Sequence, residues 1–357
     1  MARIEINLLS NSLIIQIAAV CLYKEFDYKL KLIDKPLKSS GRLFSINYSS
    51  QKLLDRIGIW ENLNINHIIP YDQINVFSRS NALISFKAND INIKNLGFIV
   101  QEDNLVKCVA DAISSIKPSP TKNISSNTLE IIGNLDECEE TKNKIEFDEK
   151  DYHQTAVNIQ IRHSKNNNLI PTQVFYEHEI LGFLPMSNNE YNLIWSMPND
   201  LNSKKLDSDD YISLLSKRAD FLLGEIDELT IGKSFPLYAR HAKEYSYANK
   251  ILIGDCAHKF HPLAGLGLNM GIEDIICLIN ILDNYSDIRT LQREYAINRI
   301  HRNNSLQKTL DVIMNFYSSQ VLSEKFKYAL LNFFNSSFFM KSAITKEATG
   351  IYHSINK

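Results

Sequence analysis

Residues 254–276, GDCAHKFHPLAGLGLNMGIEDII, combine the residue types that a cofactor site needs. Gly254 lets the end of a strand turn tightly, and the carboxylate of Asp255 can accept hydrogen bonds from sugar hydroxyls. Gly265 and Gly267 let backbone N–H groups approach a flat polar ring or a phosphate, because no Cβ stands in the way. The helix that follows directs its positive end at any anion held there. The alternative is a glycine-rich turn that only joins a strand to a helix.

The N-terminal residues predict the elements that would carry the other half of such a site. Residues 3–9 predict a strand, residues 13–24 a helix, and residues 29–33 a second strand that ends at Asp34. This β-α-β unit is typical of the start of a Rossmann-like fold, and Asp34 lies where a carboxylate would meet a ribose hydroxyl. The first 40 residues contain no glycine, however, and the three positions of a G-x-G-x-x-G turn are occupied by Ser10, Ser12 and Ile15.

Hydrophobic periodicity predicts the remaining elements. Alternating runs in 71–100 and 152–198 indicate antiparallel strands, whereas 207–230 and everything after 290 have helical spacing. We therefore expect an α/β (α+β) fold in which a Rossmann-like domain is interleaved with a smaller antiparallel-sheet domain, followed by C-terminal helices. The predicted divisions are 1–70, 97–150 and 235–300 for the first domain, 71–96 and 151–234 for the second, and 301–357 for the helices.

Composition excludes several classes of protein. The 357 residues carry a formal net charge of −2, which gives no electrostatic case for nucleic acid binding. The five cysteines are scattered and read as reduced thiols of a cytoplasmic protein. His258 and His261 lie three residues apart in a loop with no carboxylate at metal-ligand spacing, so we expect no metal site. The polar residues of the N-terminal segment argue against a signal peptide, and no apolar run is long enough to span a membrane.

The glycine motif resembles the G-D-A-A-H-x-x-x-P-x-x-G-x-G-x-N-x-G-x-x-D signature of flavin-dependent aromatic hydroxylases, in particular the ubiquinone-biosynthesis group of the para-hydroxybenzoate hydroxylase superfamily. The resemblance continues through GRLFSINYSSQKLLDRIGIWENL, with Arg42 near the flavin, and through LGFIVQEDNL, which brings Gln101 toward the cofactor. The resemblance implies that the Rossmann-like domain is an FAD-binding domain and the smaller antiparallel-sheet domain a substrate domain. It also implies reduction by NAD(P)H and hydroxylation of an aromatic ring of polyprenyl-phenol type. It assigns no catalytic residue, and the implied cofactor-binding residues are Asp34, Arg42, Gln101, Gly254, Asp255, Pro262, Gly265, Leu266, Gly267, Leu268 and Asn269.

Three departures from the family pattern concern the nucleotide end of FAD and the substrate strands. The phosphate-turn glycines are replaced, and the branched Ile15 is expected to push the first helix away from its strand. The family's Asp-Gly motif has no counterpart in the chain, and Glu179-Ile180 stand where a Gly-Pro usually precedes a substrate strand. Two interpretations stay open: a hydroxylase whose FAD is held weakly, or a non-catalytic relative with impaired FAD binding that serves as a subunit of a biosynthetic complex.

The C-terminal segment NFYSSQVLSEKFKYALLNFFNSSFFMKSAI is rich in aromatic residues at helical spacing, with Lys325, Lys327 and Lys341 interspersed. We expect helices that pack on the core. The alternative is a face that contacts a protein partner or the surface of the inner membrane, which would suit a polyprenylated substrate.

Overall fold

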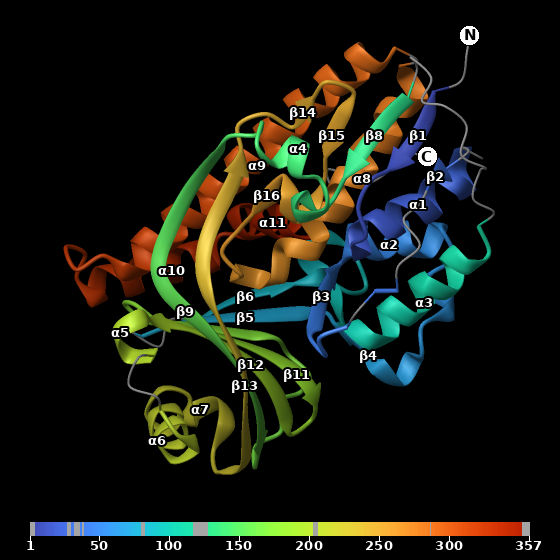
Figure 1. Ribbon diagram of the computed structural model, residues 1–357. Helices are drawn as coiled ribbons and strands as arrows, with labels where there is room; N and C mark the ends of the chain where they lie inside the picture. Colours follow the sequence, from blue (N-terminus) through green and yellow to red (C-terminus); the bar gives the residue numbers. More distant parts are fainter. Residues whose placement is uncertain are drawn as a thin grey trace.

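The computed structural model describes residues 4–26, 30–31, 36–37, 39–79, 83–116, 128–202, 206–285 and 287–351. A five-stranded sheet lies at one end of the molecule in the order β14-β15-β8-β1-β2 (Figure 1). Strands β1, β2, β8 and β15 are parallel, and β14 pairs antiparallel with β15. The strands span Glu5–Leu8 (β1), Leu30–Lys31 (β2), Thr128–Ile132 (β8), Ser246–Tyr247 (β14) and Lys250–Leu252 (β15). This parallel arrangement confirms the Rossmann-like part of the predicted fold.

A larger sheet of eight strands forms the second unit, in the order β16-β13-β9-β12-β11-β10-β5-β6. Its neighbouring strands are antiparallel except for the β5–β10 pair. The strands span Gln73–Ser78 (β5), Leu83–Lys87 (β6), Phe147–His163 (β9), Thr172–Phe175 (β10), Ile180–Ser187 (β11), Glu190–Pro198 (β12), Ile226–Ala242 (β13) and His258–Lys259 (β16). The predicted mixed α/β class is therefore confirmed, while the proposed domain boundaries stay a prediction.

Two details of the larger sheet differ from expectation. The helix predicted over 207–230 is wrong at its end: α6 (Ser208–Arg218) and α7 (Asp220–Leu223) stop at Gly224, whose φ of 65° ends helical geometry, and β13 begins at Ile226. Within the run predicted as strands over 152–198, β10 ends at Phe175 and a turn precedes β11, which begins at Ile180. At that turn, Glu179 accepts hydrogen bonds from the indole of Trp195 at 3.0 Å and from Arg218 at 2.6 Å.

A small third sheet, β3-β7-β4, carries two of the predicted site residues at its edge. Strand β3 (Leu43–Asn47) follows Arg42, and β7 (Gly97–Gln101) ends at Gln101; Leu43 and Gln101 are register partners. Strand β4 (Ile68–Tyr71) pairs with the other side of β7. Arg42 and Gln101, 59 positions apart in the sequence, are thereby brought to the same end of one sheet.

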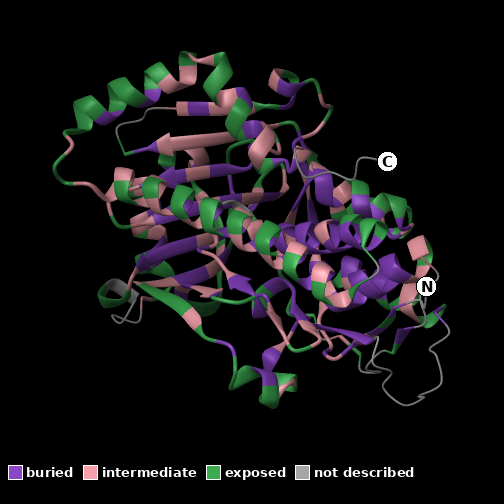
Figure 2. Ribbon diagram, turned by 90° about the horizontal axis from the view of Figure 1, so that it is seen from above, coloured by how far each residue is buried: buried purple, intermediate pink, exposed green. Residues whose placement is uncertain are grey.

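Helices surround these sheets and supply much of the core. They are α1 (Leu13–Phe26), α2 (Tyr48–Arg56), α3 (Glu102–Ser114), α4 (Glu139–Lys142), α5 (Asn199–Asn202), α8 (Leu266–Asn284), α9 (Ile288–Ser318), α10 (Glu324–Ser336) and α11 (Phe338–Ala348). The main apolar cluster joins strands of the parallel sheet to α1 and α8. Figure 2 shows buried positions concentrated in the central strands and helices, with exposed positions along the outer helices. Within the described part of the chain, no helix has the length and apolar character needed to cross a membrane.

The contact between α1 and the end of β8 explains how Ile15 is accommodated. Ile15 is 2% exposed, and a Cβ placed on Gly133 would lie only 2.5 Å from Ile15 Cγ1. Ile15 stands where the family has a helix glycine. Its side chain occupies space that is free because residue 133, directly after β8, is a glycine. The expected outward displacement of α1 is offset by this exchange of small and large residues.

This exchange predicts that Gly133→Ala destabilises the protein by about 1–3 kcal/mol, because the added methyl overpacks a buried contact. In an Ile15→Ala background, which itself costs about 2–4 kcal/mol, the same Gly133 substitution should cost less, because Cγ1 is gone and the contact with Ser12 Oγ at 2.8 Å remains. Urea unfolding of the four proteins measures the coupling. An equal cost of Gly133→Ala in both backgrounds would show that Ile15 and Gly133 do not share this space.

Candidate functional site: a cofactor cleft with two unlike halves

The glycine motif begins where β15 ends, at the edge of the parallel sheet. Gly254 has a φ of 64°, and its N–H donates to the carboxylate of Asp274 on α8 at 2.7 Å. Ideal Cβ positions on Gly254 and Gly271 lie 3.5 Å and 2.7 Å from side-chain atoms of Ile14 on α1. Gly271 therefore lets α8 approach α1 closely, whereas Gly254 is favoured by its left-handed backbone at the strand end.

Asp274 is the centre of a buried polar network. Its side chain is 0% exposed and accepts hydrogen bonds from His258 Nε2 at 2.7 Å and Arg299 Nε at 2.6 Å, in addition to the Gly254 amide. Burial alone would raise the pKa of Asp274, but the charges of His258 and Arg299, with these hydrogen bonds, lower it. Asp274 is thus an ionised group that holds the motif to α9.

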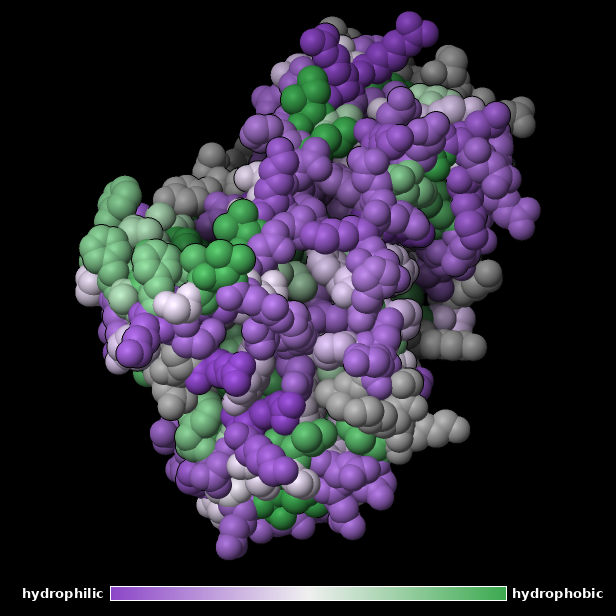
Figure 3. Space-filling model, turned by 90° about the vertical axis from the view of Figure 1, so that its left-hand side faces the viewer, coloured by the Kyte–Doolittle hydropathy of each residue, from purple (hydrophilic) through white to green (hydrophobic). Residues whose placement is uncertain are grey.

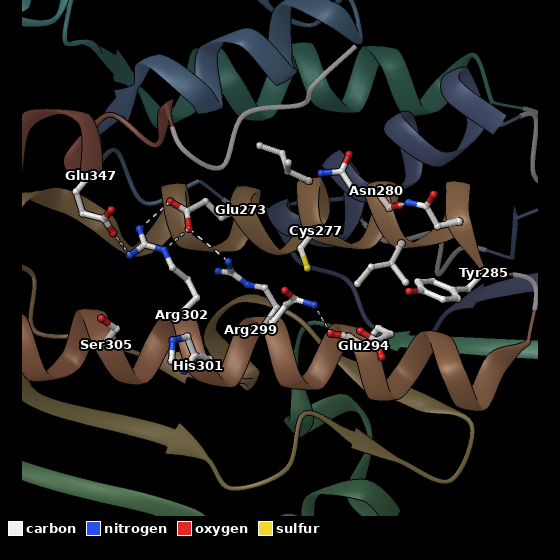
Figure 4. A pocket seen from close by; sticks show the side chains of 14 residues that line it. Glu273, Cys277, Asn280, Tyr285, Glu294, Arg299, His301, Arg302, Ser305 and Glu347 are labelled. Carbon is white, nitrogen blue, oxygen red and sulfur yellow. Dashed lines mark hydrogen bonds and ion pairs between the residues drawn. The ribbon is translucent and has the colours of Figure 1, made fainter. Parts of the chain in front are cut away.

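Charged side chains continue this network into a groove of about 600 Å³ between α8 and α9 (Figure 4). Arg299 and Arg302 both reach Glu273, at 3.4 Å and 3.1 Å, and Arg302 also pairs with Glu347 on α11. Burial raises the pKa of Cys277 in this groove to about 12, which keeps its thiol protonated at neutral pH. The groove therefore holds helices together and carries no activated nucleophile.

The N-terminus of α8 has exposed, uncapped backbone. Gly265 has a φ of 61° and is exposed, and no side chain of the described residues caps the helix. A Cβ on Gly267 would meet no described atom within 4 Å. Pro262 precedes this turn, while Leu266 and Leu268 are half-buried beside it. Uncapped amides beside exposed glycines can donate to a polar ring or an anion.

Asn269 does not point into this open space. Its Oδ1 accepts from the Asn47 N–H at 2.9 Å, and its Nδ2 donates to the Ser45 carbonyl at 2.7 Å. The predicted cofactor-binding residue thus uses its side chain to tie α8 to β3. Its side chain therefore does not contact a ligand directly. It fixes the position of the first turn of α8 relative to β3, and so relative to Arg42 and Gln101.

Arg42 is already paired. Its guanidinium lies 2.6 Å from Glu102, a carboxylate whose side chain is only 4% exposed. Burial would raise the pKa of Glu102, but hydrogen bonds from Arg42 and Ser40 outweigh it and lower the pKa to about 2. Asp255, in contrast, is exposed, and none of the described residues hydrogen-bonds to its carboxylate. Asp34 lies outside the described residues.

The turn between β1 and α1 is covered by the loop after β8. Ser10 Oγ accepts from the N–H groups of Gly133 and Asn134, at 2.7 Å and 3.1 Å. The Asn11 N–H donates to Glu137 Oε2 at 2.6 Å. A carboxylate of the chain itself therefore meets an amide at the start of α1. Glu137 could not be singled out from the sequence, because residues 136–151 form a polar, mostly acidic stretch without a motif.

An apolar cluster separates the motif loop from the eight-stranded sheet. Leu263 and Leu266 of the loop pack with Phe175 and with residues of α9, and the Phe175 and Tyr317 rings stack with centroids 4.1 Å apart. Burial lowers the pKa of the adjacent His261 to about 4, so this imidazole is neutral at neutral pH. The cluster packs the motif loop against β10, β11 and α9.

Comparisons with known proteins bear on what this cleft holds. A family model described as "FAD binding domain" matches residues 134–287. The chain is 23% identical over 319 residues to the 3-demethoxyubiquinol 3-hydroxylase of Escherichia coli (strain K12), covering 78% of this chain and 79% of that protein. It is 25% identical over 361 residues to the mitochondrial ubiquinone biosynthesis monooxygenase COQ6 of Xenopus tropicalis, covering 80% and 77%.

Over most of its length the chain is similar to FAD-dependent ubiquinone-biosynthesis hydroxylases, and residues 134–287 match the FAD binding domain family. The solved structure of p-nitrophenol 4-monooxygenase PnpA from Pseudomonas putida DLL-E4 shares its fold, with a TM-score of 0.74 and 12% identity over 98% of this chain and 99% of that one. The family resemblance inferred from the motif is therefore confirmed, and so is the para-hydroxybenzoate hydroxylase type of fold.

The residues present fit one half of FAD more readily than the other. At the N-terminus of α8, uncapped amides and the space beside Gly267 suit the polar edge of the flavin ring. At the β1–α1 turn, Glu137 stands against the amide that would meet the pyrophosphate. Among the described residues, no cluster of His, Cys, Asp and Glu has the arrangement of a metal site.

The Asp274 network predicts that Asp274→Asn costs about 3–5 kcal/mol of folding free energy, because a buried charge that pairs with His258 and Arg299 is removed. The matched control is Asp255→Asn, a carboxylate of the same motif that is exposed and should change stability by less than about 0.5 kcal/mol. Urea unfolding at pH 7 measures both. Equal, small effects would show that the network does not hold the motif in place.

The same network sets a pH dependence. The folded-state pKa of Asp274 is lowered relative to the unfolded chain, so its stabilisation is complete well above about pH 4 and is lost as pH falls through the folded-state pKa. The free energy of unfolding should therefore decline on acidification more steeply in the native protein than in Asp274→Asn. Parallel declines would contradict the assignment.

Proposed function

We propose that this protein is an FAD-dependent monooxygenase that hydroxylates an aromatic ring of polyprenyl-phenol type in ubiquinone biosynthesis, with NAD(P)H as reductant. The observation that carries the proposal is the open N-terminus of α8 beside Gly265 and Gly267, in a chain similar to these hydroxylases. FAD supplies the redox chemistry and activates oxygen. The non-catalytic interpretation is less favoured, since the relatives compared above carry hydroxylase and monooxygenase names.

The chain's own residues bind and position the reactants in this proposal. The backbone of Pro262 to Asn269 meets the flavin ring, while Gly254 and Asp255 meet its sugar hydroxyls. Arg42 and Gln101 stand toward the nucleotide end in this proposal, and Asp34, outside the described residues, is assigned to that end from the sequence alone. The apolar cluster around Phe175 and Leu263 holds the substrate ring against the motif and excludes water, which protects reactive species from side reactions.

This assignment predicts that Asp255→Ala weakens FAD binding about ten- to a hundredfold, because hydrogen bonds to a charged acceptor contribute about 1.5–3 kcal/mol. Asp111→Ala, which removes an exposed carboxylate from α3, is the control and should bind FAD as the native protein does. Calorimetric titration with FAD, supported by thermal melts, measures the affinities. Unchanged affinity in Asp255→Ala would remove this residue from the site. Absence of FAD binding by the well-folded native protein would favour the non-catalytic subunit.

We further propose that α10 and α11 contact the membrane surface that carries a polyprenylated substrate. Their outer sides expose a group of large apolar residues, Phe326, Tyr328, Leu330, Phe333, Phe338, Phe339, Met340 and Ile344. Figure 3, which views the molecule from the side of α10, shows apolar side chains gathered on this face. Lys325 and Lys346 lie on the same helices, as suits an anionic lipid surface.

Vesicle sedimentation tests this contact. With phosphatidylglycerol-rich vesicles, the double substitution Phe338→Ser/Phe339→Ser should weaken binding at least about tenfold, because two rings that are 64% and 82% exposed lose their apolar contact with lipid. The control is Ile65→Ser, which removes an apolar side chain that is 78% exposed outside these helices. No binding of the native protein to vesicles would favour a protein partner, such as another member of a biosynthetic complex, on this face.

A further inference from the structure

The amide of Asn11 lies where the proposed cofactor would place its pyrophosphate. In a dinucleotide-binding unit, the turn after the first strand and the start of the first helix present N–H groups to phosphate oxygens. Here the turn runs from Leu9 into α1, and the helix has no acidic residue in its own first turn. The anion that this positive end attracts comes instead from Glu137, 126 positions further along the chain, with a distance of 2.6 Å from Asn11 N to Glu137 Oε2.

The loop that carries Glu137 is fastened to the turn at further points. Ser10 Oγ accepts the N–H groups of Gly133 and Asn134, and Cys138 Sγ lies 3.6 Å from the Leu9 carbonyl. Ser10 is buried by these contacts. The loop is thus fastened to the turn through Ser10 and Leu9, which places the Glu137 side chain beside the Asn11 amide.

Arg42, the positively charged side chain proposed to lie toward the nucleotide end, is also paired with a carboxylate of the chain. Arg42 is bound by Glu102, which also accepts the Ser40 N–H at 2.8 Å. The two carboxylates differ in environment: Glu102 is almost completely buried, whereas Glu137 is exposed and can move into solvent. Glu137 is therefore the carboxylate that a ligand can displace.

We propose that Glu137 competes with the FAD pyrophosphate for the Asn11 amide, so that FAD binds only when this carboxylate moves away. The inference rests on the proposed function, because it takes FAD as the ligand of the cleft. Its consequence is a lowered affinity for FAD that does not extend to riboflavin, which has the same ring and ribityl chain but no phosphate. Glu137 thus determines how much the pyrophosphate of FAD adds to the binding free energy.

The experiment compares FAD and riboflavin binding to the native full-length protein, Glu137→Gln and Glu140→Gln by fluorescence titration and calorimetry. Glu137→Gln keeps the side-chain shape but removes the charge that competes with phosphate. We expect its FAD affinity to rise roughly five- to twentyfold, the range of a charged hydrogen bond discounted for exposure. Its riboflavin affinity should stay within about twofold. Glu140, also exposed on α4, controls for the change in net charge and should leave both affinities unchanged.

Each outcome decides between the proposals. Unchanged FAD affinity in Glu137→Gln, with riboflavin and FAD both bound, would overturn the role of Glu137 and leave the proposed function intact. An equal gain for FAD and riboflavin would also overturn it, because the effect would then not act through the pyrophosphate. A matching gain in Glu140→Gln would reduce the effect to general electrostatics. Failure of the native protein and both variants, all well folded, to bind either flavin would overturn the proposed function and this inference together.

Discussion

The carboxylate of Asp274 is the interaction on which the site depends. It joins the Gly254 amide at the end of β15, His258 in the motif loop and Arg299 on α9, all without access to solvent. A buried charge is stabilising only when its partners are in place, so the strand end, the loop and two helices must assemble together. The open N-terminus of α8 is a consequence, since the same helix that carries Asp274 begins at the exposed glycines.

The two ends of the cleft follow different physical rules. At α8, the chain leaves backbone amides uncapped and fixes them through the side chain of Asn269, which is hydrogen-bonded to β3. At the β1–α1 turn, Glu137 and Ser10 satisfy the groups that a dinucleotide would otherwise meet. A phosphate that binds at this turn must displace the Glu137 carboxylate from the Asn11 amide. Its binding free energy is therefore less favourable than it would be at an amide without a partner. In the proposed binding mode, an open place for the flavin ring at α8 and an amide already occupied by Glu137 at the β1–α1 turn therefore coexist in one structure.

The sequence was most informative where local pattern and function coincide. The order strand, Gly-Asp, glycine loop and helix at 250–284 could be read directly, because each residue type has a local backbone role. The end of α7 at Gly224 was missed, although a glycine there is a helix-stop signal, and β13 has too few alternating apolar residues to be recognised. Ile15 could be identified as unusual, but its partner Gly133 could not. That contact, like the one between Asn11 and Glu137, joins residues more than 100 positions apart and has no local signature.

The account makes its most direct claim about the position of one carboxylate when the cofactor is bound. A crystal structure of the native protein with saturating FAD tests it. We predict that the flavin ring lies at the N-terminus of α8 and that Glu137 has left hydrogen-bonding distance of the Asn11 N–H, with a phosphate oxygen in its place. A structure in which FAD is fully bound while the Glu137–Asn11 hydrogen bond persists would contradict the account.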